Sequence, residues 1–342
     1  MTSEKTTLYG MTLQQLSELC EREHLPRFAA SQIARWLYVS HVDSIDSMTN
    51  LSLAVRRTLQ ERYDMGLTAP LRESISADGT KKYLFATKQG EYIESAYIPD
   101  GDRATLCVSS QAGCRMGCKF CATGRQGLQH SLSAGEIINQ ILSIPDSKKL
   151  TNVVFMGMGE PLDNTDEVLR AIDILTAKWG FGWSPTRITL STAGVAKELP
   201  RFLNESKAHL AISLPNPFHD ERAEIMPIEK AYPIREVMDI LRRYDFTSQR
   251  RVSFEYILME GLNDSPRHIK ELCRLLDGVK CRINLIRFHK IPDSPYYSPS
   301  EEQMIAFRNT LTAKGIQTTI RTSRGEDIQA ACGLLSTKAK QQ

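Results

Sequence analysis

Three cysteines stand close together in the stretch Cys114-Arg-Met-Gly-Cys118-Lys-Phe-Cys121, with the spacing C-x3-C-x2-C. A strand-like run, Thr105-Leu-Cys-Val-Ser-Ser, precedes this stretch, and Ser133-Ala-Gly-Glu136 follows it with the spacing of a helix-capping box. The sequence therefore predicts three thiolates on one loop between a strand and a helix. Such a set suits a soft metal, or an iron–sulfur cluster that keeps one iron open to a substrate.

Strand-like and helix-like segments alternate around this loop. The strand-like runs cover residues 83–87, 92–98, 105–110, 153–156, 187–191, 209–214, 252–258, 282–286 and 317–321. Alternation of this kind favours a parallel α/β sheet or barrel. In the first 80 residues, by contrast, the spacing of Leu and Ile predicts short amphipathic helices. We expect a small helical domain over residues 1–80 and one catalytic domain over residues 81–342.

The composition is that of a globular protein. Of the 342 residues, 43 are basic and 40 acidic, so the net charge of +3 neither demands nor excludes a nucleic-acid partner. The chain has no signal-peptide pattern and no apolar run of about 18 residues, so we expect a cytoplasmic protein without a membrane partner. In that reducing compartment, clustered cysteines indicate metal binding or catalysis rather than disulfides.

Polar groups also follow several predicted strands. In Met156-Gly-Met-Gly-Glu160-Pro161 the glycines allow a ligand to approach the backbone, and Glu160 offers an acceptor for an ammonium group. Ser191 and the triplet Ser213-Leu214-Pro215 end two further strands, where a parallel barrel opens toward its ligands. Taken alone, these segments are more typical of turns and helix caps.

Two cysteines outside the cluster complete the set of candidates. Cys107 lies on the strand before the cluster loop, and Cys332 lies in a polar, glycine-flanked segment after the last strand. Each could be a small buried hydrophobic residue. If the segment around Cys332 reaches the barrel mouth, exposure makes that thiol reactive.

Together these segments resemble the RlmN/Cfr family of radical S-adenosylmethionine (SAM) RNA methyltransferases. The resemblance also extends to Met226-Pro-Ile, to Asp327-Ile-Gln-Ala-Ala-Cys332-Gly and to Gln32-Ile-Ala-Arg-Trp-Leu-Tyr in the N-terminal part. It implies a partial (β/α)6 radical SAM barrel with an N-terminal helical accessory domain that helps to bind RNA.

The resemblance also implies a set of site residues. Cys114, Cys118 and Cys121 would hold a [4Fe–4S] cluster, and SAM would be used twice per turnover. Cys332 would be methylated, Cys107 would form a disulfide with it to release the RNA, and Glu94 would accept the ring proton of an adenine. The SAM contacts would be Gly159, Glu160, Ser191, Ser213, Leu214, Pro215 and His289.

Two activities occur in this family. One is methylation at C2 of an adenosine in the peptidyl-transferase region of 23S rRNA and of the adenosine 3′ to the anticodon in tRNA. The other is methylation at C8 of the same rRNA adenosine, which confers antibiotic resistance. We favour the C2 activity because it is the common housekeeping one. We also expect an electron donor such as a flavodoxin or ferredoxin, and a monomer. Arg115, Lys119 and Arg125 around the cluster loop are candidates for phosphate contacts, but each is equally typical of a solvated surface charge.

The chain departs from the family pattern at Pro215, where His is common, at His289, where Asn is common, and at Leu334, where Gln is common. None of these changes removes an essential reactive group. Two alternatives stay open. One is a non-catalytic RNA-binding protein in which His130 joins the three cysteines on zinc, and the other is a radical SAM enzyme that acts on a small molecule.

Overall fold

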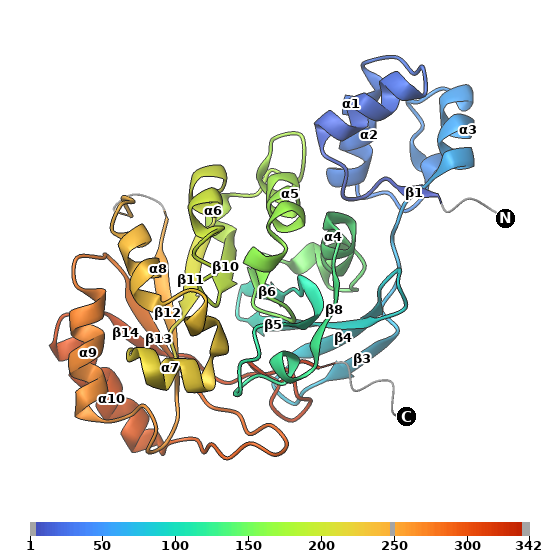
Figure 1. Ribbon diagram of the computed structural model, residues 1–342. Coiled ribbons are helices and arrows are strands. Elements are labelled where there is room, and N and C mark those ends of the chain that lie inside the picture. Colours follow the sequence, from blue (N-terminus) through green and yellow to red (C-terminus); the bar gives the residue numbers. More distant parts are fainter. Residues whose placement is uncertain (1–4, 247–249, 337–342) are drawn as a thin grey trace.

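The structure, a computed structural model, describes residues 5–246 and 250–336. Its N-terminal part is a group of helices set apart from the rest in Figure 1. The elements of this part are β1 (Thr6–Thr7), α1 (Leu13–Arg22), α2 (Ala29–Tyr38), α3 (Leu53–Arg62) and β2 (Tyr63–Asp64). Strands β1 and β2 pair in parallel and hold the two ends of the group together. The short amphipathic helices predicted for this region are therefore present.

The N-terminal part packs against the larger one through aromatic and backbone contacts. The ring of Tyr38 lies 5.8 Å from that of Trp179. Gly10 approaches the backbone at the start of α4 (Ala134–Leu142) in the larger part so closely that a Cβ on Gly10 would lie 2.3 Å from the nitrogen of Gly135. At φ +95° this position also favours glycine over any other residue. The close contact fixes where the accessory helices sit.

The larger part is built on one sheet, which has ten strands in the described residues. Its order is β14-β13-β12-β11-β10-β9-β6-β5-β4-β3. The strands from β6 to β14 pair in parallel, and β5, β4 and β3 extend the sheet in antiparallel pairing. Their bounds are β3 Arg72–Ile75, β4 Lys81–Ala86, β5 Tyr92–Asp100, β6 Arg103–Cys107, β9 Asn152–Phe155, β10 Ile188–Thr192, β11 His209–Ser213, β12 Val252–Leu258, β13 Arg282–Arg287 and β14 Thr318–Ile320.

Helices connect the parallel strands, as Figure 1 shows. They are α4 (Ala134–Leu142), α5 (Thr165–Thr176), α6 (Leu199–Glu205), α7 (His219–Ile225), α8 (Ile234–Leu241), α9 (Pro266–Leu276) and α10 (Glu301–Ala313). Alternate strand residues such as Leu190, Ile212, Phe254 and Leu285 are fully buried in one core with residues of these helices. Because neighbouring strand residues face opposite ways, the residues between them face the inside of the curved sheet.

The predicted partial (β/α)6 barrel is confirmed, with β14 added as a further parallel strand. The capping box at Ser133 is also present, because its hydroxyl accepts from the Glu136 N–H and the Glu136 carboxylate accepts from the Ser133 N–H. We expected the helical part to reach residue 80, but β3 pairs with β4 and so belongs to the large sheet. We therefore propose a boundary between β2 and β3. In the described residues no helix is long and apolar enough to span a bilayer.

Candidate functional site

The three clustered cysteines lie on a loop that leaves strand β7 (Gln111–Cys114), which pairs with β8 (Gly127–Ser131). Cys114 and Cys118 are buried and Cys121 is partly buried. Burial raises the pKa of the Cys114 thiol to about 12 and that of Cys118 well above its usual value, and the neighbouring thiols of the set raise both further. Three neighbouring thiols, two of them buried, that oppose one another's ionisation fit a cationic iron–sulfur cluster, which stabilises their thiolates.

A single metal ion fits the loop less well. In residues 5–246 and 250–336 no three His, Cys, Asp or Glu side chains are grouped tightly enough to hold one ion. His130, the fourth ligand of the zinc alternative, lies on β8 with its Nε2 3.7 Å from a carboxylate oxygen of Glu136. The geometry therefore gives no support to a zinc site.

Glu160 lies at the carboxyl end of β9 and is buried. Its two oxygens accept hydrogen bonds from the N–H groups of Leu162 (3.0 Å) and Ala193 (2.7 Å). Burial raises the pKa of its carboxyl to about 7, while these bonds act in the opposite direction. Within residues 5–246 and 250–336 this buried carboxylate has no cationic partner, which suits the ammonium group of a bound amino acid moiety.

Gly159 keeps the backbone open beside Glu160. Its φ is +99°, and a Cβ there would lie 2.6 Å from the Cβ of Gln111 and 2.7 Å from its nitrogen. Gln111 in turn accepts from the Glu160 N–H through its side-chain oxygen, at 2.9 Å. The sequence Gly159-Glu160 therefore needs its glycine for both conformation and space.

The residues expected to contact SAM at the neighbouring strands also lie at carboxyl ends. Ser191 is on β10 and Ser213 ends β11, both partly buried, and Leu214 is buried. Pro215 has no backbone N–H, so its carbonyl is its one backbone group that can form a hydrogen bond. This carbonyl already accepts from the Asn263 side chain at 2.6 Å. His289 follows β13, and its Nε2 lies 3.2 Å from the Ser323 hydroxyl.

A buried ion pair fixes these strand ends, and sequence reasoning missed it. Arg222 on α7 and Glu229 are both fully buried and paired with each other. Arg222 also donates to the carbonyls of Ala193 (2.8 Å) and Ser213 (3.1 Å). Burial lowers the pKa of its guanidinium, and Glu229 opposes this. Nothing in the polar segment His-Asp-Glu-Arg of α7 signals a buried arginine.

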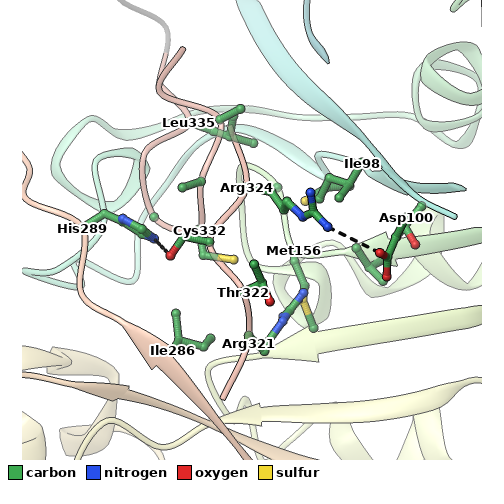
Figure 2. A pocket seen from close by; sticks show the side chains of 18 of the residues that line it. Ile98, Asp100, Met156, Ile286, His289, Arg321, Thr322, Arg324, Cys332 and Leu335 are labelled. Carbon is green, nitrogen blue, oxygen red and sulfur yellow. Dashed lines mark hydrogen bonds and ion pairs between the residues drawn. The ribbon is translucent and has the colours of Figure 1, made fainter. Parts of the chain in front are cut away.

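Cys107 and Cys332 line the same cavity, which has a volume of about 320 Å³ and is also lined by Cys121 and His289. Figure 2 shows Cys332 at its centre, between His289 and Arg321. Cys332 is exposed and Cys107 is buried, and both are free thiols. Burial raises the pKa of the Cys107 thiol to about 12, with a smaller contribution from Cys332. The structure thus brings together two cysteines that are 225 positions apart in the sequence.

Arg321 is a second residue that sequence reasoning missed. It follows β14, lines the cavity, and interacts electrostatically with both Cys332 and Cys107. Cys332 is the first of the charges that raise the pKa of Arg321, and Arg321 in turn lowers that of Cys107. A guanidinium in this position stabilises a thiolate on Cys107.

Glu94 lies on the inner face of β5 but not in the wall of the cavity itself. Ile98, four residues further along the same face, does line the cavity. The Glu94 carboxylate is 3.0 Å from the Lys82 ammonium and accepts from the Ser336 N–H at 2.9 Å. Burial raises the pKa of this carboxyl, and Lys82 opposes the rise. Glu94 is therefore close to the cavity and held by the last residue that the structure describes.

The three cations expected to contact RNA are exposed around the cluster loop. Arg115 pairs with Asp163 at 2.7 Å, and Arg125 donates to the carbonyl of Pro292 at 2.5 Å. Lys119 is exposed as well. Two of the three cations therefore have partners within the protein.

Two family models match the chain. The radical SAM superfamily model matches residues 108–276. The model of the ribosomal RNA large subunit methyltransferase N-terminal domain matches residues 6–65, which hold the helical part described above.

Known proteins match over nearly the whole chain. The probable dual-specificity RNA methyltransferase RlmN of Phocaeicola vulgatus is 56% identical over 100% of this chain and 98% of its own. The protein of that name from Bacteroides fragilis is 57% identical over 99% of this chain and 98% of its own. A crystal structure of a radical SAM methyltransferase from Sphaerobacter thermophilus has a TM-score of 0.91 at 40% identity, covering 97% of this chain and 100% of that one.

Proposed function

The chain belongs to the RlmN family of radical SAM RNA methyltransferases, and on this premise we propose that it methylates C2 of an adenosine in both 23S rRNA and tRNA. Relatives that are 56–57% identical carry the name of dual-specificity RNA methyltransferase, which supports two RNA substrates. The observation that carries the proposal is the shared cavity of Cys107, Cys332 and Cys121. In this cavity two thiols, those of Cys107 and Cys332, lie beside the cluster loop and are not joined in a disulfide.

Each residue has a separate task in the proposed reaction. When bound, the [4Fe–4S] cluster and SAM supply the radical and the methyl group, and two SAM molecules are used per turnover. Cys114, Cys118 and Cys121 hold the cluster, and SAM is held by the Gly159–Glu160 turn, by Ser191, by residues 213–215 and by His289. Glu160 offers its buried carboxylate to the SAM ammonium group.

The two outer cysteines carry the carbon to the RNA and release it. Cys332 takes the methyl group on its exposed sulfur. This methyl group loses one hydrogen atom to the radical that SAM would supply, and its carbon becomes bonded to C2 of the adenine. Glu94 removes the ring proton from C2, and the one electron left over would be accepted by the cluster, which is the one-electron carrier of the site. The thiolate of Cys107 then attacks the sulfur of Cys332, so a disulfide forms and the carbon–sulfur bond breaks. The electron pair of that bond stays on the new methyl carbon, which takes up a proton. Arg321 stabilises the attacking thiolate.

We further propose a cytoplasmic monomer that receives electrons from a flavodoxin or ferredoxin. The exposed cluster loop with Lys119 and Arg125 offers a surface from which such a donor reaches the cluster.

Analysis of RNA nucleosides tests the proposal. Anaerobic protein with SAM, a reductant and either RNA should give 2-methyladenosine, identified by mass spectrometry. Cys107→Ala should instead accumulate a covalent protein–RNA adduct, because Cys332 cannot be released, and Cys332→Ala should give neither adduct nor product. Cys281→Ala, a cysteine outside the cavity, is the matched control. A product of 8-methyladenosine in rRNA alone would assign the C8 activity instead.

A further inference from the structure

On the inner face of the parallel strands, several residues nearer the amino ends than the cysteines are polar. Barrels of alternating strands and helices usually fill this space with branched apolar side chains. On β6 this face carries Arg103, Thr105 and Cys107, at every second position. On β13 it carries Arg282, Asn284 and Ile286, again at every second position. On both strands the cationic end is the amino end, away from the end that carries the cofactor residues. The inside of the barrel therefore changes from apolar and sulfur-bearing to cationic along its axis.

A second cavity of about 460 Å³ lies at this amino end. We call it the floor cavity, defined by Arg103, Thr189, His209, Arg251, Arg282 and Arg321 among its lining residues. Arg103, His209 and Arg282 are the first residues of β6, β11 and β13, and Arg251 directly precedes β12. Arg103, Arg251 and Arg282, which are far apart in sequence, thus converge because parallel strands bring their amino ends to one edge. Arg321 reaches the same cavity from the carboxyl end of β14.

Among the lining residues that the structure describes, positive charge exceeds negative charge in the floor cavity. In the described residues the guanidinium groups of Arg103, Arg251 and Arg282 make no hydrogen bond or ion pair. The one carboxylate among the residues that line the cavity, Glu255, lies 3.5 Å from Arg321.

The pKa values of the neighbouring groups are shifted by the same excess of positive charge. Burial and then the charge of Arg251 lower the pKa of Arg282. Burial and these arginines also lower the pKa of His209 to about 4, which leaves it neutral at pH 7. Like charges held together in this way are stabilised by a bound anion.

The floor cavity continues into the cysteine cavity. Arg103, Val154, Met156 and Arg321 line both. Figure 2 shows Met156 and Arg321 beside each other near Cys332, and Arg321 lies 3.3 Å from the Met156 sulfur. Cys107 is four residues from Arg103 along β6, a distance of roughly 13 Å in an extended strand. A ligand at the arginines is therefore a near neighbour of a ligand at the cysteines.

We propose that the floor cavity binds a phosphate group of the substrate RNA, on a nucleotide next to the one held at Cys107 and Cys332. Guanidinium groups match the oxygens of a phosphate in pairs, and Asn152 and Thr189 add neutral donors to the same wall. This inference rests on the proposed function, in which the substrate is RNA. A free phosphate ion has the same chemistry, so the test separates the two sources.

The experiment compares Arg103→Gln, Arg282→Gln and the double variant with Arg235→Gln. Arg235 lies exposed on α8 and does not line either cavity, so it is the matched control. Binding of a tRNA anticodon stem-loop to the anaerobic holoprotein is measured at several salt concentrations. Each floor variant should weaken binding about tenfold and reduce the slope of log K against log salt by about 0.7. Arg282→Lys should recover part of the slope because it keeps the charge.

Two results would overturn the proposal. One is that the floor variants, with iron content and circular dichroism like those of the parent, bind RNA as Arg235→Gln does. The other combines two measurements. The floor variants bind RNA as the parent does, and inorganic phosphate raises the Tm of the parent but not that of the double variant. The cavity would then bind a free anion and not the RNA. A parent that needs Arg282 for RNA binding but forms no 2-methyladenosine would support the floor cavity and refute the proposed function.

Discussion

Replacing Arg222 with methionine tests the buried ion pair that supports the strand ends at the proposed SAM site. The substitution leaves Glu229 as a fully buried carboxylate without its cation. The two Glu229 oxygens still share the Ile234 N–H, whose nitrogen lies 3.0 and 3.1 Å from them, and one oxygen keeps its contact with the His219 ring. Because these remain, the loss lies at the lower end for a broken buried pair, about 3 kcal/mol.

Two carbonyls lose a donor in the same variant. Those of Ala193 and Ser213 accept from Arg222, and each lost hydrogen bond costs about 1 kcal/mol. The expected decrease in the free energy of unfolding of Arg222→Met is therefore about 5 kcal/mol. Adding Glu229→Gln removes the unpaired charge and keeps an acceptor for Ile234, so the double variant should recover about 3 kcal/mol of this.

Equilibrium urea denaturation, followed by circular dichroism under anaerobic conditions, measures these differences. Arg201→Met is the control, because it breaks an exposed pair with Asp166 and should cost less than about 1 kcal/mol. If the double variant is as unstable as Arg222→Met, the cost does not come from the buried charge and the reasoning fails. An Arg222→Met protein as stable as the parent would refute it as well.

Three further predictions concern single residues. Gly159→Ala should abolish SAM binding in equilibrium dialysis, because its Cβ would meet the Gln111 backbone at 2.7 Å; unchanged binding would contradict the close approach. The pKa of Glu160 near 7 predicts that SAM binding weakens as the pH falls below 7, because the carboxyl becomes protonated. Glu160→Gln should bind weakly without that dependence. Lys82→Met removes the cation beside Glu94, so the pKa of Glu94 should rise. The acidic limb of the pH–rate profile should then move to higher pH. A limb that does not move would exclude Glu94 as the base.

The strands and the cluster loop could be predicted from local sequence. Runs such as 252–258 combine length with β-branched and aromatic residues, and the capping box at Ser133 depends on side chains three positions apart. The short strands β3, β7 and β8 were missed because their few residues form a strand only through their partners.

Which residues of the candidate site lie together was predictable only where a pattern is contiguous. The three clustered cysteines lie on one loop, whereas Arg222 and the floor arginines belong to elements far apart in the chain. The alternation of Arg103, Thr105 and Cys107 is visible in the sequence, but the sequence does not tell which face of a strand points into the barrel. Tertiary packing alone makes Arg222 a buried residue and Arg103 a cavity residue.

The segment that carries Cys332 is attached to the cluster loop by the Ala122 N–H, which donates to Gly333 at 2.8 Å, and by the Thr123 hydroxyl, which donates to Leu335 at 2.7 Å. Asp327 also accepts from Ser76, 251 positions earlier. Synthesis proceeds from the N-terminus, so the thiols of the loop leave the ribosome long before their reactive counterpart. A nascent chain therefore holds a cluster loop without Cys332, and in the proposed reaction the enzyme cannot modify RNA until the segment that carries Cys332 has been synthesised and has docked on that loop.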